Sequence, residues 1–366
     1  MNKLRIGIVG TGYTIGIAKA HIQAYQGLPE AEITAFYDVI PGRAEQFIKD
    51  NNISGGKICV SMEELLAAVD AISICVPNNQ HFPAAKAAVD AGKHFLCEKP
   101  LSVSWVEAKK FVDYVRGRRN KVIAMVGFNY RDIPAVRWMK KIIDEGKIGR
   151  VYSCVQQLGG PRIADPVKVK REWRMDKEQS GAGALPDFGS HMLDLADYLL
   201  SGENGKICRV QSFKNTFITQ RPAVDGSGML PVTNDDAAVF NAVTEKGSLC
   251  SFYACRIGIP FQTLQITGEG GMLLFNAQGP KKPGETQRLG IQLKEKGGGY
   301  TGPMAWEEVP PEFSGREGHR GIAMDFINAI RNGGDCGDRE IERGLYIQQL
   351  LEKVNEAAER GEIVNL

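Results

Sequence analysis

Two segments of the chain contain residues that can move a proton beside a bound cofactor. Residues 181–194 read GAGALPDFGSHMLD, which places Asp187 and His191 four residues apart. Residues 98–100 read Glu-Lys-Pro after the apolar run HFLC. Histidine titrates near neutral pH, and a lysine beside a positive charge shifts toward its neutral form. His191 and Lys99 therefore suit the oxidation of an alcohol, in which a hydride leaves carbon and a base removes a proton from oxygen.

The spacing of Asp187 and His191 fits the start of a helix. If that helix begins near Phe188, Asp187 is its N-cap and His191 lies one turn further along, on the stripe of Leu195 and Leu199. Two interpretations stay open at this point. Either His191 is a buried histidine on the core face, with Asp187 only capping the helix, or His191 points into a cofactor cleft as the active base.

The lysine signal is weaker when it stands alone. Lys99 ends an expected strand, a place from which a side chain reaches a bound cofactor. Pro100 removes a backbone donor and permits a cis peptide bond. A lysine before a proline is also common on protein surfaces, so the tripeptide needs the support of the other segments.

The chain begins with a signal for nucleotide binding. Residues 4–16 read LRIGIVGTGYTIG, an apolar run that stops in glycines between an expected strand and an expected helix. Such glycines let the backbone turn sharply and approach a pyrophosphate, which then faces the positive end of the helix. The third glycine, Gly16, comes one residue later than usual. The predicted cradle consists of Gly10, Gly12, Tyr13, Thr14 and Ile15.

An acidic residue supports this interpretation. Asp38 ends the second expected strand, 22 residues after Gly16. A carboxylate there binds the ribose hydroxyls and repels a 2′-phosphate, so we expect NAD as the cofactor, while the nearby Arg43 keeps NADP open. Ligands of such sheets lie outside the carboxyl ends of the strands, so Pro77 and Asn78 are expected to border the same cleft.

The first part of the chain has the pattern of a parallel sheet. β-like runs alternate with helical patterns up to about residue 125, which predicts a sheet with helices on both faces. The continuous apolar run at 71–76 fits a strand that is buried on both sides. We therefore predict a dinucleotide-binding Rossmann domain over residues 1–126.

The remaining chain, residues 127–366, is predicted to form a second α/β domain. After Arg150, long β-like stretches are separated by turns, which indicates an open, mostly antiparallel sheet with one inserted helix at about 188–200. Two further helices close the chain at about 320–331 and 340–360. Residues 277–303 are rich in Gly, Lys and Pro and are expected to form a surface excursion.

Composition narrows the class of protein. The 366 residues suit two domains, and a net charge of +2, from 45 basic and 43 acidic residues, gives no reason to expect nucleic acid or a membrane as a partner. Glycines interrupt the first apolar stretch, so we expect a cytoplasmic protein without a leader. The eight cysteines form no CxxC pair and are expected to be buried free thiols, and the five histidines are scattered, so no metal site is predicted.

Taken together, these residues resemble the Gfo/Idh/MocA oxidoreductases, the glucose–fructose oxidoreductase and inositol dehydrogenase group. The resemblance spans nearly the whole chain, although the longer glycine loop departs from the family pattern. It implies that the C-terminal sheet forms a subunit interface, and hence a homo-oligomer. Its marks are Gly10-Thr-Gly12, Asp38, VPNNQH at 76–81, Glu98-Lys99-Pro100, GFNYR at 127–131 and the Asp187/His191 segment.

The resemblance also implies roles for individual residues. Lys99, Asp187 and His191 match the catalytic lysine and the Asp/His pair of the family. Glu98 and His81 match positions that usually line the cofactor. Candidates for the substrate pocket are Asp187 and His191 together with Asn129, Tyr130, Arg131, Trp173 and Asp194.

The implied function is NAD-dependent oxidation of a secondary hydroxyl of a sugar, glycoside or inositol. His191 would accept the proton, oriented by Asp187, and Lys99 would share it. Segments 159–174 and 277–303 favour a substrate larger than a free hexose, as in family members that oxidise C3 of a glycoside. Some members keep the cofactor tightly bound through the cycle. Alternatives are an inositol dehydrogenase, an NAD-binding sensor without chemistry, and a reductase of a C=N or tetrapyrrole substrate.

Overall fold

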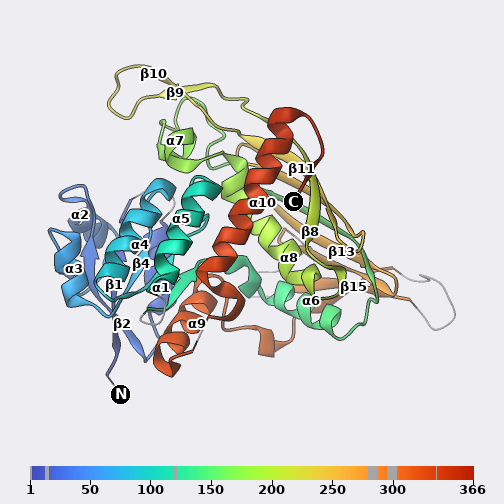
Figure 1. Cartoon of the computed structure of the whole chain (residues 1–366), viewed down its shortest axis with the longest axis horizontal. Helices are drawn as coiled ribbons and strands as arrows, with labels where there is room; N and C mark the ends of the chain where they lie inside the picture. Colours follow the sequence, from blue (N-terminus) through green and yellow to red (C-terminus); the bar gives the residue numbers. More distant parts are fainter. Residues whose placement is uncertain (1, 13–15, 119–121, 279–286, 295–302, 335) are drawn as a thin grey trace. The chain divides into compact units, whose positions relative to one another are not determined.

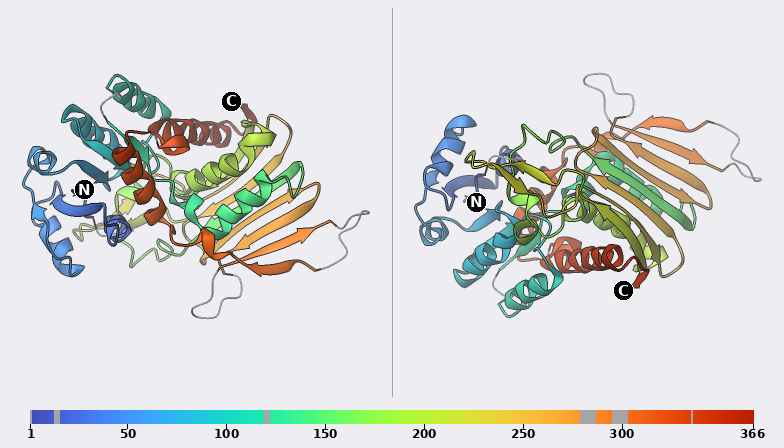
Figure 2. Two further views of the ribbon diagram at one scale, coloured as in Figure 1. Left: turned by 90° about the horizontal axis from the view of Figure 1, so that it is seen from below. Right: turned by 90° about the horizontal axis from the view of Figure 1, so that it is seen from above.

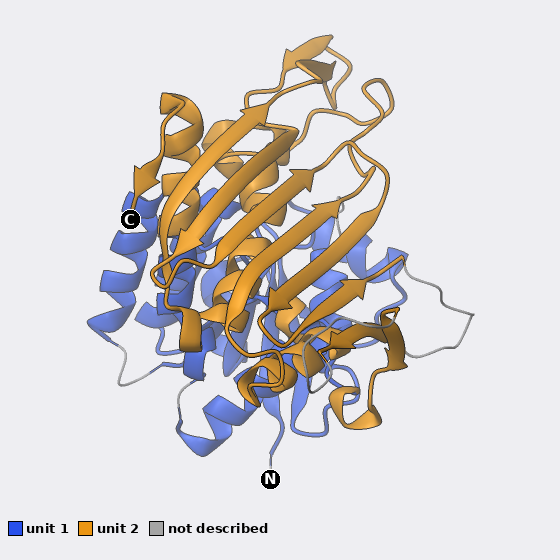
Figure 3. Cartoon of the chain, turned by 90° about the vertical axis from the view of Figure 1, so that its right-hand side faces the viewer, with its two compact units in different colours: residues 1–129, 315–348 blue, residues 130–314, 349–366 orange. Residues whose placement is uncertain are grey.

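The structure, a computed structural model, divides into two compact units (Figure 3). Unit 1 comprises residues 1–129 and 315–348, and unit 2 comprises residues 130–314 and 349–366. The described residues are 2–12, 16–118, 122–278, 287–294, 303–334 and 336–366.

Unit 1 contains a six-stranded parallel sheet in the order β3-β2-β1-β4-β5-β6 (Figure 1). The direction of the strand order reverses between β1 and β4, where an open sheet of this kind binds its ligand. The order confirms the predicted Rossmann sheet. The strands are β1 Leu4–Val9, β2 Ala31–Tyr37, β3 Lys57–Ile58, β4 Ala71–Ile74, β5 His94–Cys97 and β6 Ala124–Val126.

Helices cover both faces of this sheet, as the continuous apolar strands require. On one face, Ile72 and Phe95 pack in a core with Phe111. On the other face, Ile6 packs in a core with Phe326. The helices of unit 1 are α1 Ile17–Tyr25, α2 Arg43–Asp50, α3 Met62–Ala68, α4 His81–Asp90, α5 Trp105–Arg116, α9 His319–Asn332 and the first part of α10 Ile341–Arg360.

The division differs from the predicted boundary at 126/127 in one respect. The prediction placed both closing helices in the second domain. In the structure the chain returns to unit 1, where Ile322 and Phe326 of α9 complete the core around Ile6. An amphipathic helix shows which of its faces is apolar, but its sequence does not specify which sheet that face covers.

Unit 2 contains a nine-stranded sheet in the order β16-β15-β14-β13-β7-β12-β11-β8-β17. β7 and β12 pair in parallel, and the other pairs of this sheet are antiparallel, which confirms the predicted sheet type. The strands are β7 Val151–Gly159, β8 Ile207–Asn215, β11 Ala237–Thr244, β12 Leu249–Cys255, β13 Phe261–Gly268, β14 Gly271–Asn276, β15 Arg288–Leu293, β16 Ala305–Glu308 and β17 Val364–Asn365.

Helices of unit 2 lie on one face of this sheet. Figure 2 shows α6 (Pro134–Asp144) and α8 (Ser190–Asn204) along that face, and Figure 3 shows the opposite face with no helix in front of it. A separate hairpin-like pair is formed by β9 (Gln220–Pro222) and β10 (Met229–Pro231). The predicted excursion at 277–303 contains strand β15, and most of its other residues lie outside the described part of the chain.

Two predictions from composition can be compared with the fold. All eight cysteines are free, and six of them are buried, as expected. Among the described residues, none of the helices combines the length and the apolar character that crossing a membrane demands.

Candidate functional site

The glycine loop of unit 1 has the geometry of a pyrophosphate cradle. Gly10 has φ of 88°, and a Cβ there would lie 2.7 Å from Cγ1 of Val76, so only glycine fits this close approach of β1 and β4. A Cβ on Gly12 would meet nothing within 4 Å, which leaves the backbone open to a ligand. Gly16, in the left-handed conformation, is the N-cap of α1 without a side-chain cap. The one-residue extension of the motif therefore delays the helix to Ile17. Tyr13, Thr14 and Ile15 lie outside the described residues.

Asp38 connects this loop to the end of β2. One oxygen of its carboxylate accepts hydrogen bonds from the backbone N–H of Thr11 at 2.8 Å and from its hydroxyl at 2.9 Å. The other oxygen accepts from the N–H of Ile40 at 3.0 Å and lies 3.6 Å from Arg43. Asp38 and Arg43 thus lie together where the adenosine half of a dinucleotide fold ends, and the contact of Asp38 with a ribose stays a prediction.

The segment after β4 lies at the same edge of the sheet. Pro77 precedes the short helix Asn78–Gln80, and α4 begins at His81. The ring of His81 is fully buried, with Nδ1 2.9 Å from the carbonyl oxygen of Pro100 and Nε2 3.1 Å from that of Val76. His81 therefore holds the loop after β4 against the loop after β5.

The Glu-Lys-Pro segment follows β5 at this edge. Lys99 is half-buried, its peptide bond to Pro100 is cis, and its N–H donates to Oε2 of Glu98 at 3.2 Å. The buried carboxylate of Glu98 also contacts two histidines, with its Oε1 2.8 Å from Nε2 of His21 and 3.3 Å from Nε2 of His319. Burial disfavours the charge, but these two hydrogen bonds hold the pKa of Glu98 well below its usual value.

Neither His21 nor His319 was identified from the sequence. The five histidines are scattered along the chain, yet the fold brings these two to one carboxylate from helices α1 and α9. The three side chains place their ligand atoms within 4.8 Å of one another, a proximity that their scattered positions in the sequence do not reveal. The absence of a metal site stays a prediction. Asn129, a predicted substrate residue, also belongs to unit 1, and its amide nitrogen lies 3.5 Å from Nδ1 of His319.

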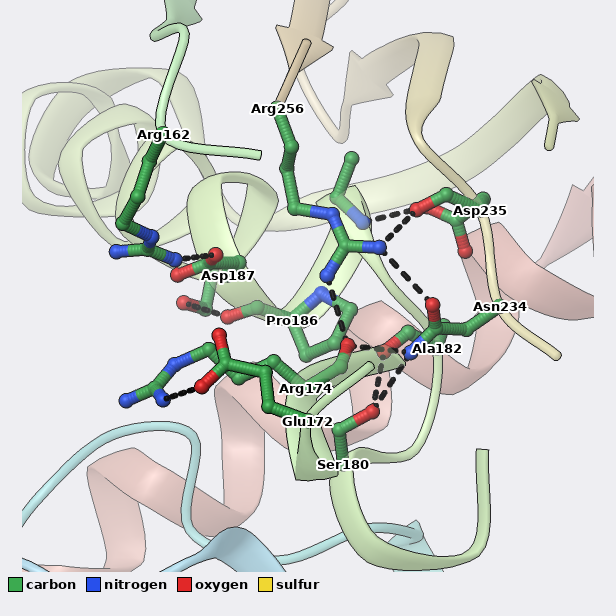
Figure 4. Close-up of polar contacts among 12 residues, drawn as sticks. Arg162, Glu172, Arg174, Ser180, Ala182, Pro186, Asp187, Asn234, Asp235 and Arg256 are labelled. Carbon is green, nitrogen blue, oxygen red and sulfur yellow. Dashed lines mark hydrogen bonds and ion pairs between the residues drawn. The ribbon is translucent and has the colours of Figure 1, made fainter. Parts of the chain in front are cut away.

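In unit 2, Asp187 is not a helix N-cap. Residues Leu185–Gly189 form a π-helical turn that continues into α8 at Ser190. Asp187 lies inside this turn, and its carboxylate accepts a hydrogen bond from Nη2 of Arg162 at 2.8 Å (Figure 4). The expected start near Phe188 was wrong because a buried carboxylate from another segment caps the turn.

That carboxylate belongs to Asp235. Its two oxygens accept from the backbone N–H groups of Gly183 at 2.8 Å, Ala184 at 2.6 Å and Leu185 at 3.3 Å. A Cβ on Gly183 would lie 1.8 Å from the carbonyl oxygen of Asp235, so glycine is required at this position. Arg256 donates to the same carbonyl oxygen at 2.7 Å. The turn that carries Asp187 is thus fastened from a loop more than 40 residues away in the sequence.

His191 is the second residue of α8 and has an aromatic partner. Its ring is 5% exposed and stacks on Tyr130, with ring centroids 3.9 Å apart and planes at 8°. Burial raises the pKa of Tyr130 to about 12, and the nearby charge of Asp187 acts in the same direction. Tyr130 therefore joins two groups in one cluster, because it stacks on His191 and the charge of Asp187 acts on its phenol.

Two predicted substrate residues, Arg131 and Asp194, bond to each other. The guanidinium of Arg131 donates to both oxygens of Asp194, at 2.8 and 2.6 Å, and both side chains are buried. The guanidinium of Arg131 also lies 4.8 Å from the ring centroid of Tyr198. This pair fastens the segment of Tyr130 to α8, which holds the stacked ring over His191.

A second ion pair lies close to Asp187. Arg174 lies 3.4 Å from Glu172, and its guanidinium covers the ring of the predicted substrate residue Trp173 at 4.1 Å. Burial lowers the pKa of Arg174 to about 10, against the opposing effect of Glu172 and Asp187. No specific signal in the sequence pointed to Arg162, Glu172 or Arg174, although all three fall in the segment 159–174 that was expected to shape the pocket.

The predicted residues thus divide between the two units. Gly10, Gly12, Asp38 and Arg43 lie in unit 1 with Pro77, Asn78, His81, Glu98 and Lys99, whereas Tyr130, Arg131, Trp173, Asp187 and His191 lie in unit 2. Unit 1 has the residues that were predicted to hold a dinucleotide. Unit 2 has a base, an acid and paired charged side chains, which donate to and accept from hydroxyl groups.

Comparison with known proteins agrees with this division. Residues 4–128 match the family described as "Oxidoreductase family, NAD-binding Rossmann fold", and residues 136–274 match the "GFO/IDH/MocA C-terminal domain". Over 303 residues the chain is 30% identical to levoglucosan dehydrogenase of Pseudarthrobacter phenanthrenivorans, which covers 75% of this chain and 74% of that protein.

Two further comparisons show similarity, one to a relative over a shorter stretch of sequence and one to a solved structure over the whole fold. The chain is 33% identical over 200 residues to glucose-6-phosphate 3-dehydrogenase of Bacillus subtilis, covering 54% of each protein. A solved structure of levoglucosan dehydrogenase in complex with NADH and L-sorbose superposes with a TM-score of 0.87 at 26% identity, covering 99% of this chain and 98% of that chain.

Proposed function

Because this chain belongs to the Gfo/Idh/MocA family of NAD-binding oxidoreductases, we propose that it oxidises a secondary hydroxyl of a sugar or glycoside. The observation that carries the proposal is the cluster of His191, Tyr130 and Asp187 in unit 2. It supplies a proton acceptor and neighbours that fix its orientation. The named substrates of the relatives, levoglucosan and glucose 6-phosphate, are the first candidates.

The reaction needs one proton and one hydride to leave the substrate. NAD, when bound, accepts the hydride from the carbon atom. We assign the proton of the hydroxyl group to His191, because an imidazole is a suitable base near neutral pH. Tyr130 keeps the imidazole plane fixed by stacking, and Asp187 adds a negative charge beside it, which stabilises the imidazolium that forms. We assign to Lys99 of unit 1 a share in binding this proton.

The paired side chains of unit 2 support a polyhydroxylated substrate. Carboxylates such as Asp187 and Glu172 accept hydrogen bonds from sugar hydroxyls, and guanidiniums such as Arg162 and Arg174 donate to them. We favour oxidation at C3, the position named in the glucose-6-phosphate 3-dehydrogenase relative. An inositol dehydrogenase is the second candidate, because a cyclitol offers the same ring of secondary hydroxyls. An NAD-binding sensor is disfavoured because both Lys99 and His191 are present.

The test is NADH absorbance on protein supplied with NAD and a panel of levoglucosan, hexoses, hexose phosphates, aryl glycosides and inositols. Steady NADH formation with one class would establish the activity and its substrate class. A burst limited to the enzyme concentration would show that the cofactor is retained. His191→Gln and Lys99→Met should each lower kcat by at least about a hundredfold while NADH still binds. Full turnover in both variants would refute the assignment, as would the absence of any reaction with every class.

A further inference from the structure

One cluster of titratable side chains in unit 1 has no part in the reaction described so far. His21 from α1, Glu98 from the end of β5 and His319 from the start of α9 meet at a single carboxylate oxygen. The side chains are 1%, 8% and 18% exposed, respectively. Three elements that are distant in sequence thus converge on one buried acid, beside Lys99.

The hydrogen bonds around the cluster specify where its protons lie. The amide nitrogen of Asn129 lies 3.5 Å from Nδ1 of His319. With this nitrogen as the donor, a neutral imidazole carries its hydrogen on Nε2, toward Glu98. The second donor is Nε2–H of His21 at 2.8 Å, and the third is the backbone N–H of Lys99 at 3.2 Å. Three N–H groups therefore face one carboxylate, which is the surrounding of an anion rather than of a neutral acid.

The same three side chains have the composition of a metal site, but their arrangement favours the anion. A metal ion needs a lone pair from each imidazole nitrogen. With Asn129 donating to Nδ1 of His319, the Nε2 atom carries hydrogen and has no lone pair to offer. Both Nε2 atoms also approach the same oxygen of Glu98, at 2.8 and 3.3 Å, which is the geometry of two hydrogen bonds to one acceptor.

The position of this anion in the fold indicates which part of the cofactor it affects. In this strand order, one half of the sheet receives the adenosine and the other half receives the nicotinamide. Asp38, at the end of β2, marks the adenosine half. Glu98 follows β5 and therefore belongs to the nicotinamide half. The nicotinamide ring carries a positive charge when oxidised and none when reduced, so a fixed negative charge in this half distinguishes the two forms.

We infer that the His21–Glu98–His319 cluster is a fixed buried anion that makes unit 1 bind oxidised NAD more tightly, relative to NADH, than it otherwise would. It thereby favours oxidation of the substrate. The inference rests on the proposed function only in sharing its cofactor. It assigns His21 and His319 as positioning residues, which act through Glu98.

The test measures the dissociation constants of NAD⁺ and NADH by calorimetry, without any sugar. Glu98→Gln keeps the shape of the side chain and removes its charge. We expect it to weaken NAD⁺ binding about tenfold relative to NADH, whereas Glu98→Asp should stay near the wild-type ratio. Asp70→Asn is the matched control, because it also removes a carboxylate that accepts from a backbone N–H, but one that precedes β4 and pairs with Arg5.

His319→Leu provides a second test if Glu98→Gln does not fold. His319 is the more exposed of the two histidines, and its loss removes one donor from the anion, so the ratio should move in the same direction by about threefold. An unchanged NAD⁺/NADH ratio in Glu98→Gln, or in His319→Leu if the first does not fold, would overturn the inference. Stoichiometric metal in the purified wild-type protein, lost in Glu98→Gln, would also overturn it. Because these titrations use no sugar, their result can be interpreted even if the proposed function is wrong.

Discussion

At the scale of single residues, the ion pair of Arg162 with Asp187 distinguishes this site most clearly from a generic base and acid. The guanidinium donates to the carboxylate at 2.8 Å, while the same carboxylate lies near Tyr130 and Arg174. Arg162 is therefore placed to hold the side chain of Asp187 in one orientation. A carboxylate with a fixed orientation acts on the neighbouring imidazole without the cost of ordering itself during the reaction.

Arg162→Gln should lower kcat about tenfold, since a hydrogen bond to a charged group is lost, and leave the dissociation constant of NADH unchanged. Arg162→Lys keeps the charge but loses the two-pronged donor geometry of the guanidinium. Its kcat should therefore lie between the kcat of the wild type and that of Arg162→Gln. Steady-state kinetics on the identified substrate measures both. Arg288→Gln is the matched control, because Arg288 also pairs with an acid and its side chain is equally exposed, at 34%. Equal kinetics in the Arg162 and Arg288 variants would show that the pair has no part in catalysis.

His21 gives unit 1 a pH-dependent stability. Burial lowers the pKa of His21 below 6.5 in the folded protein, and the bond to Glu98 offsets this only in part. The unfolded chain then binds more protons below that pH, so the contribution of His21 to stability is present above pH 6.5 and is lost as the pH falls through the folded value. The free energy of unfolding should therefore fall between about pH 6.5 and pH 5.

Denaturant unfolding at several pH values tests this, with His21→Gln as the comparison. The variant should lose less stability on acidification than the wild type. Part of the dependence of unfolding free energy on pH should remain, because burial also lowers the pKa values of His81 and His94. The stability that is lost when Glu98 becomes protonated is lost at lower pH, because the pKa of Glu98 in the folded protein is depressed below 4.5. Identical slopes in the two proteins would contradict the role given to His21.

At the scale of elements, the π-helical turn Leu185–Gly189 depends on a side chain outside it. Asp235 accepts three backbone N–H groups at the start of this turn while being buried. A helix start that is buried without such a partner leaves its donors unsatisfied. Asp235 therefore determines where the turn begins, and with it the positions of Asp187 and His191.

Asp235→Ala should cost about 2–4 kcal/mol of unfolding free energy and lower kcat/KM by at least about tenfold, whereas Asp235→Asn should lose less of both. The neighbouring Asp236 is the matched control. It is also buried, and it accepts the N–H groups of Phe217 and Ile218, both at 2.8 Å, so Asp236→Ala should cost similar stability and keep its kcat/KM. If the two variants lost activity equally, destabilisation alone would explain the effect of Asp235.

These elements also show what the sequence can reveal. Apolar runs such as 71–76 identified parallel strands such as β4, because burial on both faces leaves a local mark in the sequence. Strand β3 is only two residues long and leaves no such mark. The start of the π-helical turn that leads into α8 could not be placed, because its cap, Asp235, comes from a loop that no spacing rule connects to residue 183. The same reason hid His21 and His319 as partners of Glu98.

At the scale of the whole molecule, the helix-free face of the nine-stranded sheet carries apolar side chains side by side. Val239 of β11 pairs in register with Phe213 of β8 and with Tyr253 of β12. Their exposed fractions are 44%, 65% and 37%, and Ser212, Phe240 and Phe252, which are their neighbours along the three strands, are buried. A continuous apolar patch of this kind on a sheet marks a contact surface rather than a solvated face.

We propose that a second copy of the chain covers this face, so that the protein is a homo-oligomer. A charge placed at its centre would then be buried without a partner on association. Val239→Lys should weaken self-association at least tenfold, measured by sedimentation velocity over a range of protein concentrations, while activity per chain stays within about twofold. Val60→Lys is the matched control, since Val60 is 90% exposed in unit 1. A wild-type protein that sediments as a monomer at micromolar concentration would refute the proposal. So would a Val239→Lys protein that associates as tightly as the wild type, because the same lysine would then have to lie unpaired inside an interface.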